Sequence, residues 1–417
     1  MIELLLRRYI PIIIFIFLSL GFISLSIDPH IANKAITIAG LLSLALVSFN
    51  VRYYLLLSKG MKCFFLSLLF LGCLNLLWYG YFKTPEAIYK NAYRGYLEAG
   101  KMLFFSAFIL LVITKREIFS SYNYFLIPAL TGHIILLIRA FYQGAYLNID
   151  RIPLSAMDAV PGTMGAATIA AYMITFSSLY ALLTLLKSNL KYRLPLFFII
   201  FILSFSAVTM TGTRSAIFTL PLITAIALIF SYKDKRKVIK IIPVFVILVL
   251  ACGLLFNKAI TSRVNLAYKD VELYKKGKAS TSIGARFAML EGGFLVTEKD
   301  LTWQSLEDRG RKIKQLSQEN KIFNSVSAYL DVHMHNEWIE ALSTKGIIGI
   351  IILVFFYISL AYYSFSEKEP LILTFLIAML LFGISDVIMH AKPIPSSWLT
   401  TLLLFCSLIS ERRNRTI

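Results

Sequence analysis

Long apolar runs separated by short polar segments make up most of this chain. A run of about 20 apolar residues is long enough to cross the hydrocarbon core of a bilayer as a helix. Twelve such runs lie near residues 9–27, 31–49, 63–82, 96–114, 124–142, 163–186, 194–211, 215–232, 239–256, 347–365, 371–388 and 394–410. The pattern predicts an all-α polytopic membrane protein with about twelve transmembrane helices.

One long segment, residues 257–346, interrupts the series and has the composition of a soluble domain. It separates transmembrane helices 1–9, predicted within residues 1–256, from helices 10–12 and a cytoplasmic tail within residues 347–417. We expect the long segment to form a helical loop domain that folds against the membrane.

Two helices are expected within this loop domain. From Thr302 to Leu330 the apolar residues recur at intervals of three, four and seven, which predicts an amphipathic helix. A short second helix is expected from about Asn336 to Thr344, with Gly346 as its C-terminal stop. The unpaired N–H groups and the dipole at its start favour a nearby anion.

The composition agrees with a membrane protein. Of the residues, 58% are hydrophobic and only 16% are charged, whereas soluble proteins have about 25% charged residues. The first run, residues 9–27, is longer than the apolar region of a signal peptide, which spans about 7 to 15 residues. We therefore interpret it as a retained transmembrane helix.

The positive charges are unevenly distributed between the two sides of the predicted bundle. With the N-terminus inside, the inner segments hold 19 Lys and Arg residues, the short outer segments hold 9, and the long segment holds the other 14. Long segments are exempt from the positive-inside rule, so both termini are expected in the cytoplasm and the long segment outside. Topology then explains much of the net charge of +19, and no nucleic-acid partner is expected.

Charged residues at the outer ends of the runs are candidates for function, because ionisable groups at bilayer depth are costly. Arg214 follows a Thr-Gly-Thr turn with almost no room for a loop. It either reaches toward lipid headgroups or binds a substrate, and the Thr and Gly residues favour binding. Asp386 has no charged neighbour in sequence, so it needs a partner in space. It either forms a structural contact with an arginine or a helix end, or takes a direct part in function. His390 and Lys392 follow on the same edge and could equally be interfacial anchors.

Within the long segment, His335 and Arg286 have the most informative surroundings. His335 lies in the sequence His-Met-His-Asn-Glu, where the segment meets the tenth run. Together with His333 it would make too small a ligand set for zinc, and no cysteine or third histidine lies nearby in sequence. A general base or an orienting donor is the favoured interpretation, and a structural histidine is the alternative. Arg286, near a predicted helix start, is either an anion-binding residue or a solvated side chain.

In their order and placement, these features resemble the bacterial O-antigen ligases of the wider O-antigen ligase/polymerase superfamily. The resemblance covers essentially the whole chain. It rests on the twelve runs, the long outer loop, the Thr-Gly-Thr-Arg214 turn, Gly-Ala-Arg286, His335-Asn-Glu followed by Gly346, and Ile-Ser-Asp386. It implies a glycosyltransferase-C-like fold in the bacterial inner membrane, with the active site on the periplasmic side. The implied reaction transfers O-antigen glycan from undecaprenyl pyrophosphate to the lipid A-core oligosaccharide in lipopolysaccharide biosynthesis.

The residues fit this chemistry when considered independently. A lipid-linked diphosphate needs cations beside apolar helices, and Arg214 and Arg286 supply permanent charge with two donors each toward phosphate. They stabilise the negative charge that grows on the leaving diphosphate, so no metal or other cofactor is expected. His335 would accept the proton of the acceptor hydroxyl, with in-line attack inverting the anomeric centre. Asp386 would orient a catalytic or substrate group.

Three alternative functions remain open from the sequence. An O-antigen polymerase would use a second lipid-linked glycan as acceptor, and a protein O-oligosaccharyltransferase would use a protein. Both would need the same donor site. A lipid-linked glycan transporter would bind the diphosphate without chemistry and would need charged residues along a path to both faces, whereas the polar residues singled out above cluster on the outer side.

Overall fold

The structure, a computed structural model, describes residues 2–49, 54, 57–114, 122–154, 166–232, 234–298, 301–390 and 393–414, and all regular elements in these ranges are helical. The first nine are α1 (Ile2–Ser24), α2 (Pro29–Ser48), α4 (Lys59–Phe82), α5 (Lys90–Ile113), α6 (Asn123–Phe141), the π-helical turn η1 (Tyr142–Tyr146), α7 (Ala166–Lys187), α8 (Arg193–Thr211) and α9 (Arg214–Ser231). The others are α10 (Lys235–Leu255), α11 (Asn257–Lys275), α12 (Ser282–Leu295), α13 (Leu306–Glu319), the 3-10 turn η2 (Lys321–Phe323), α14 (Asn324–Ser327), α15 (Glu337–Ser366), α16 (Ile372–Ser385) and α17 (Pro393–Asn414).

The predicted all-α polytopic membrane fold is confirmed. Among the described residues, ten helices are long and apolar enough to cross a membrane, and two further apolar helices, Tyr9–Ser24 and Ile372–Ser385, are shorter. Each of the twelve predicted runs coincides with one of these helices, except that the start of the sixth, at residues 163–165, lies outside the described residues. The count of twelve spans stays a prediction.

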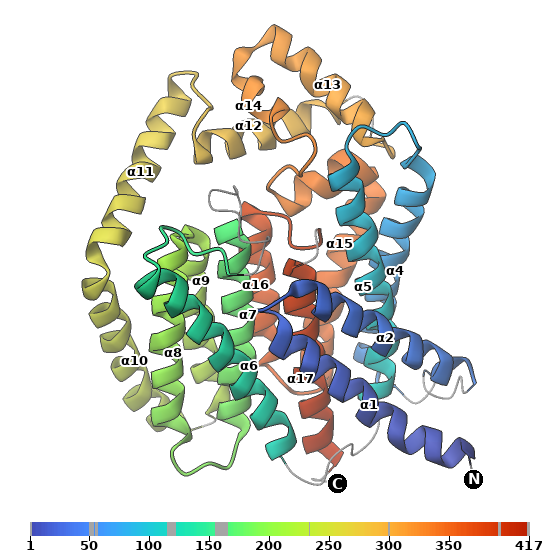
Figure 1. The fold of residues 1–417 in the computed structure, drawn as a ribbon, viewed down its shortest axis with the longest axis vertical. Coiled ribbons are helices and arrows are strands. Elements are labelled where there is room, and N and C mark those ends of the chain that lie inside the picture. The colour runs from blue at the N-terminus through green and yellow to red at the C-terminus, as the bar shows by residue number, and fades with distance from the viewer. Residues whose placement is uncertain are drawn as a thin grey trace.

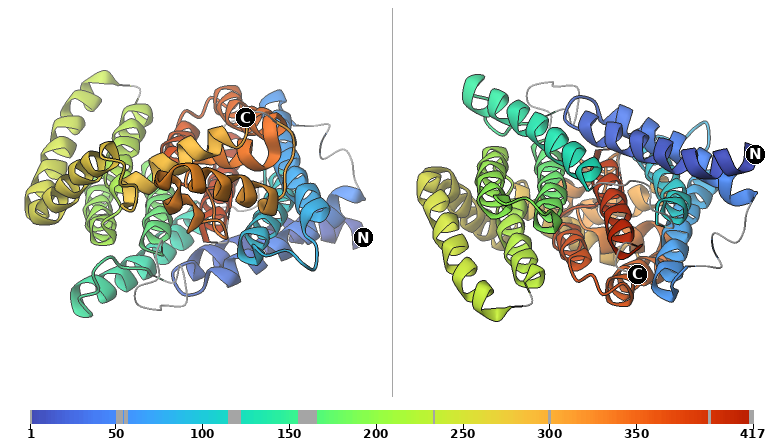
Figure 2. Two further views of the ribbon diagram at one scale, coloured as in Figure 1. Left: turned by 90° about the horizontal axis from the view of Figure 1, so that it is seen from above. Right: turned by 90° about the horizontal axis from the view of Figure 1, so that it is seen from below.

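Small residues place α7 and α17 at the centre of the bundle. The apolar stretch of α7 is buried along its whole length and that of α17 to 94%, and Figure 2 shows α17, in red, surrounded by the other spans. Ala170, Ala171, Ser177 and Ser178 are among the buried residues of α7. Small side chains of this kind let neighbouring helices approach closely in a membrane.

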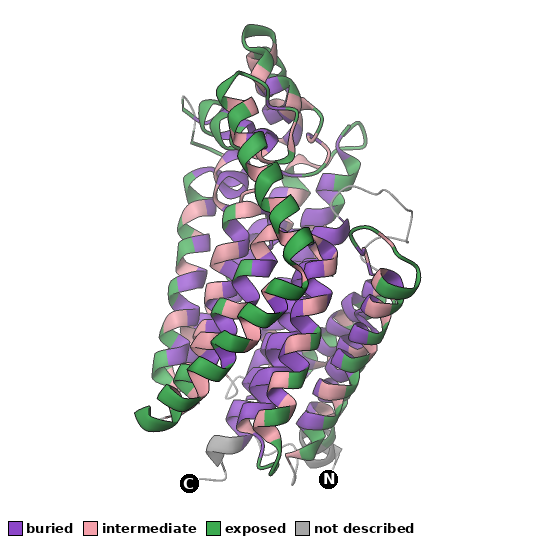
Figure 3. Ribbon diagram, turned by 90° about the vertical axis from the view of Figure 1, so that its left-hand side faces the viewer, coloured by how far each residue is buried: buried purple, intermediate pink, exposed green. Residues whose placement is uncertain are grey.

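Helix α10 shows the opposite pattern. Only 11% of its apolar stretch is buried within the protein, so its Val, Ile and Leu side chains point outward. The side of the molecule that α10 and α11 form is accordingly rich in exposed residues (Figure 3). An exposed apolar helix of this length is stable against lipid and unfavourable in water, which supports its assignment as a span.

The loop domain covers one end of the bundle. Helix α11 continues from α10 along the side of the molecule, and α12, α13 and α14 lie across the top, whereas α1 begins and α17 ends at the opposite end (Figure 1). A separate hydrophobic core joins this domain to the spans. Trp78, Tyr93 and Tyr96 from α4 and α5 pack there with Met289 and Ile313 from the loop domain.

The two helices predicted in the loop domain are present, the first with one correction. The amphipathic helix predicted from Thr302 to Leu330 is broken at Asn320, which has extended dihedral angles and accepts the N–H of Ile322 with its side chain. An Asn that hydrogen-bonds the local backbone in this way competes with the helix. Apolar residues of the predicted pattern are nevertheless buried on both sides of the break, namely Leu306 and Ile313 before it and Phe323, Val326 and Leu330 after it.

The second predicted helix ends at Gly346 as expected, and the tenth span follows it directly, so α15 comprises two helices joined across a kink. That glycine has a φ of 59° and a ψ of −152° inside α15, so it kinks the helix between its first turns and the span. A side chain at this position would collide with the carbonyl oxygen of Leu301, which accepts the N–H of Ile347 at 3.0 Å. The kink therefore lets the first turns of α15 pack against the loop domain.

Candidate active site

His335 lies in a strained backbone conformation immediately before α15. Its φ is 47°, in the left-handed region, which costs a residue other than glycine about 1–3 kcal/mol. Asn336 caps the helix, because its side chain accepts the N–H groups of Trp338 and Ile339, both at 3.0 Å. The amide of Asn336 also donates to the carbonyl of Ile384 at 2.9 Å. The cap therefore connects the start of α15 to the end of α16.

This connection brings Asp386 to His335. Asp386 follows α16 directly, and its Oδ1 lies 3.2 Å from Nδ1 of His335 and 3.5 Å from Nε2 of His333. Burial disfavours the charge on this carboxylate, but the opposing effects of His335, His333 and Arg286 hold the pKa of Asp386 well below its usual range. Asp386 is therefore ionised near neutral pH. Its predicted need for a partner in space is met by two histidines.

The protonation of the two rings follows from these contacts. Burial lowers the pKa of His333 to about 3, so the ring is neutral, and its Nδ1 accepts the N–H of His335 at 3.2 Å. Its proton is then on Nε2, facing Asp386. A carboxylate can only accept, so His335 donates from Nδ1, and in this tautomer the lone pair is on Nε2. The side chain of His335 is 18% exposed, against 10% for His333 and 5% for Asp386.

The same three side chains could also hold a metal ion. One ligand atom from each of His333, His335 and Asp386 lies within 4.8 Å of the others. No cysteine or third histidine lies close to the two histidines in sequence, but the fold brings them a carboxylate from the end of α16.

A short loop after α16 completes this side of the site. Glu337 accepts the N–H groups of Ile388 and Met389 at 2.6 and 3.1 Å, which fixes the loop to α15. His390 is buried, its Nε2 lies 3.0 Å from the carbonyl oxygen of Ala92, and burial lowers its pKa. The interpretation of His390 as an interfacial anchor is therefore wrong, and Lys392 lies outside the described residues.

Arg214 lies at the start of α9, after the tight turn that the sequence predicts. Gly212 ends α8 with a φ of 63°, so the chain reverses within two residues. Nη1 of Arg214 lies 3.8 Å from Oδ2 of Asp270 in α11. This contact with the loop domain holds Arg214 near the protein surface, which disfavours the alternative of a side chain that only reaches toward lipid.

Three further arginines gather around Arg214. Arg263 of α11 lies 3.9 Å from Asp150, and Arg151 donates from Nε to the carbonyl oxygen of Thr211 at 3.2 Å. Burial, together with the charges of Arg263, Arg286 and Arg214, lowers the pKa of Arg151. The charge of Arg286 acts on both Arg151 and Asp386, so Arg286 is within electrostatic reach of both. The described site thus combines positive charge with a histidine and a carboxylate.

Two cavities adjoin the arginine cluster, and Arg263 lines both. One has a volume of about 300 Å³ and is lined by polar groups that include Asp150, Arg151 and Arg263. The other has a volume of about 520 Å³ and lies among α8, α9, α10 and α11. Its lining is apolar apart from Arg214 and Arg263. A ligand with an anionic group and a long apolar tail would bind the arginines with the first and the apolar lining with the second.

Sequence reasoning found four of the residues that gather here and missed three. Arg214, Arg286, His335 and Asp386 are brought to one end of the bundle as expected. The residues missed are Arg151, Arg263 and His333 in its role as a partner of Asp386. The only signal for the arginines was their position at the outer ends of runs, which they share with ordinary surface residues.

The chain matches known proteins over the part that contains most of this site. Residues 199–354 match the family model described as O-antigen ligase. The chain is 29% identical over 358 residues to the O-antigen ligase of Escherichia coli (strain K12), a match that covers 84% of this chain and 82% of that protein. It is also 26% identical over 238 residues to an uncharacterized protein of Haemophilus influenzae, which covers 54% of this chain and 57% of that protein.

Proposed function

Because this chain belongs to the O-antigen ligase family, we propose that it transfers O-antigen glycan from undecaprenyl pyrophosphate to the lipid A-core oligosaccharide, on the periplasmic face of the inner membrane. The observation that carries this proposal is the contact of His335 with Asp386 beside the arginine cluster. The partly exposed ring of His335 is held by a carboxylate near arginines suited to a diphosphate.

The arginine cluster and the apolar cavity support binding of the donor. Arg214 and Arg263 line one end of a cavity whose remaining surface is apolar, so the diphosphate contacts guanidinium groups while the polyprenyl chain lies among α8 to α11. Arg286 connects this location with Asp386. The positive charge of Arg286 therefore acts close to the C–O bond between the glycan and the diphosphate, which breaks in the reaction.

The reaction is an in-line displacement at the anomeric carbon. The acceptor hydroxyl oxygen forms the new glycosidic bond, and the C–O bond to the diphosphate breaks, with its electron pair leaving on the diphosphate. The hydroxyl proton passes to Nε2 of His335, and Asp386 stabilises the imidazolium that results. The attack inverts the anomeric centre. Fixed arginines stabilise the charge on the leaving group, so the proposed mechanism requires no metal.

The position of the site favours a transferase over a transporter. The histidines and the arginine cluster are at the loop-domain end of the bundle, opposite the start of α1 and the end of α17 (Figure 1). A transporter would need polar groups along a path between the two faces. The polymerase and the protein transferase share the donor site, and only the acceptor separates them from the ligase.

Transfer by the purified full-length protein tests the proposal. Undecaprenyl pyrophosphate-linked O-antigen is the donor and lipid A-core the acceptor, and wild type is compared with His335→Ala and with His30→Ala, a control in the first turn of α2. We expect transfer to lipid A-core that survives EDTA, is lost in His335→Ala and is retained in His30→Ala.

Each other outcome changes the assignment. Transfer only to a second lipid-linked glycan identifies a polymerase, and transfer only to protein identifies a protein O-oligosaccharyltransferase. Donor binding without transfer to any acceptor supports the transporter. Loss of transfer in EDTA with recovery on adding a divalent cation would reassign His333, His335 and Asp386 as metal ligands.

A further inference from the structure

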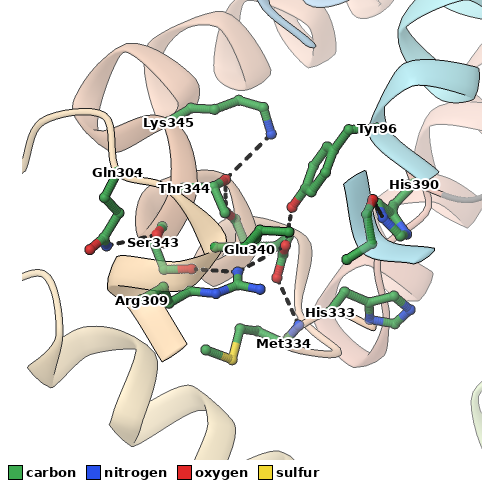
Figure 4. Close-up of polar contacts among 12 residues, drawn as sticks. Tyr96, Gln304, Arg309, His333, Met334, Glu340, Ser343, Thr344, Lys345 and His390 are labelled. Carbon is green, nitrogen blue, oxygen red and sulfur yellow. Dashed lines mark hydrogen bonds and ion pairs between the residues drawn. The ribbon is translucent and has the colours of Figure 1, made fainter. Parts of the chain in front are cut away.

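One buried carboxylate links three parts of the molecule behind the candidate base. Glu340 lies in the first turns of α15, and its side chain is 2% exposed. It accepts hydrogen bonds from Nη1 of Arg309 at 2.9 Å, from the hydroxyl of Tyr96 and from the backbone N–H of Met334 at 2.7 Å (Figure 4). The three donors come from the loop domain, from span α5 and from the chain just before α15.

The bond to Met334 bears directly on His335. Met334 precedes His335, whose left-handed backbone is unfavourable for a residue with a side chain. A strained conformation persists only where its surroundings hold it on both sides. Glu340 holds the N–H before His335, and Asn336 holds the chain after it through the carbonyl of Ile384. Loss of the first bond would allow the imidazole to rotate away from Asp386.

Arg309 of the loop domain balances the negative charge of Glu340. Arg309 belongs to α13, its side chain is 1% exposed, and it also donates to Oγ of Ser343 at 3.3 Å. A buried guanidinium of this kind depends on its carboxylate partner, because removing one member leaves an uncompensated charge. In Figure 4 the guanidinium of Arg309 lies between Ser343 and Glu340.

The chain just before α13 is fixed to the same turn of α15. Gln304 donates from its side chain to the carbonyl of Ser343 at 2.7 Å, and its backbone N–H donates to the carbonyl of Thr344 at 3.1 Å. The indole of Trp78 donates to the carbonyls of Gln304 and Thr344 at 3.1 and 3.0 Å. Docking of α13 therefore fixes the position of Arg309 relative to Glu340.

We propose that Glu340 is a positioning residue for His335, and that Arg309 makes this positioning depend on docking of the loop domain. The proposal rests on the proposed role of His335 as the base. Glu340 acts through the backbone of Met334 and does not contact substrate. Its loss displaces the base, and a displacement of about 1 Å can lower a rate about 100-fold.

The test is steady-state transfer by purified protein carrying Glu340→Gln. Gln keeps the shape of the side chain, but its single amide oxygen cannot accept from Met334 and also from Arg309 and Tyr96, so an amide donor must face one of these two sites. We expect kcat to fall by about 100-fold while the KM for the donor and direct donor binding stay at wild-type values. Arg311→Lys is the matched control, because Arg311 is also in α13 but is 69% exposed and pairs with Asp308; it should leave kcat unchanged.

A double variant separates positioning from a general loss of structure. In the His335→Ala background the base is already absent, so adding Glu340→Gln should lower the residual rate no further. If Glu340→Gln lowered the transfer rate by the same factor in the wild-type and the His335→Ala backgrounds, the proposal would be overturned. A wild-type kcat in folded Glu340→Gln would also overturn it. If Glu340→Gln does not accumulate, Arg309→Lys is measured instead. It keeps the charge but loses the planar fork, and an unchanged kcat in that variant would likewise overturn the proposal.

The two proposals fail in different ways. A fully active His335→Ala removes the base and the positioning role together. An inactive His335→Ala with a wild-type kcat in Glu340→Gln removes only the positioning role. Purified protein of both variants is compared by gel filtration and thermal denaturation, so that a change in kcat is interpreted only for folded protein.

Discussion

Asp386 places one carboxylate oxygen 3.2 Å from Nδ1 of His335, although the two residues are 51 positions apart in the chain. The same oxygen accepts the N–H of Val387 at 2.9 Å. Its direction is therefore set by its own backbone as well as by the histidine. This arrangement selects the tautomer of His335 and fixes the plane of its ring.

Asp386→Asn should leave the protein folded and lower kcat by about 100-fold or more. The amide preserves the shape of the side chain, but it cannot balance an imidazolium and can present a donor to Nδ1. The measurement is kcat and donor KM in the purified transfer reaction. Asp234→Asn is the control, because Asp234 only caps α10 and Asn caps helices equally well. A kcat within error of wild type would leave Asp386 with a structural role alone.

Arg214→Lys should lower kcat/KM for the donor by about 10- to 100-fold, since a bond to a charged group contributes about 1.5–3 kcal/mol. Lys keeps the charge but donates from a single point, so it cannot bridge two phosphate oxygens. Direct binding of the lipid-linked donor, alongside kinetics, checks the result. Full activity in Arg214→Lys would show that charge alone is needed at this position.

Arg263→Gln should weaken donor binding by about tenfold or more and leave the acceptor KM unchanged. Arg263 lines both cavities next to the cluster, so it is expected to contact the diphosphate. Lys258→Gln, in the first turn of the same helix, is the comparison. Equal binding of the donor by the two variants would exclude Arg263 from the donor site.

The stability of the protein should fall between pH 7 and pH 5. His333 has a pKa of about 3 in the fold and about 6.5 unfolded, so below pH 6.5 the unfolded chain binds a proton that the folded protein does not. This contribution is complete above pH 6.5, decreases toward pH 3, and amounts to about 2 kcal/mol lost at pH 5. Thermal denaturation in detergent measures it. His333→Gln should reduce the difference between the two pH values, and His30→Gln should not.

Gly346→Ala should destabilise the protein by about 2 kcal/mol or more, because a positive φ and a collision with the Leu301 carbonyl act together. A lower Tm and less protein in the membrane are the expected observations. Gly80→Ala is the control, since a methyl group at Gly80 in α4 meets no atom within 4 Å. Equal Tm values for the two variants would contradict the importance of the kink.

The sequence predicts the membrane fold well because each span can be recognised from its own apolar composition. The same holds for local features, such as the turn before Arg214 and the helix start after His335, which depend on neighbouring residues. The break at Asn320 was missed because a periodic apolar pattern continues on both sides of it. A local side-chain bond to the backbone ended the helix without changing the pattern.

Contacts between distant segments could not be predicted in the same way. The need of Asp386 for a partner was visible, but the identity of that partner depends on how α15 and α16 pack. From the sequence alone, Arg309 is one of several charged residues in a predicted amphipathic helix and has no feature that indicates burial. Its burial against Glu340 follows from docking of the loop domain, which no local pattern specifies.

The core shared by the loop domain and the spans constrains how the protein is assembled. The indole of Trp78 in α4 donates to the carbonyl of Gln304, 226 residues later in the chain, and Tyr93 and Tyr96 of α5 belong to the same core. The ribosome makes these aromatic residues long before their partners. The ends of α4 and α5 that carry these aromatic residues therefore remain uncovered until the loop domain has been made. A loop domain severed from the spans would lose Trp78, Tyr93 and Tyr96, the aromatic residues that α4 and α5 contribute to its core.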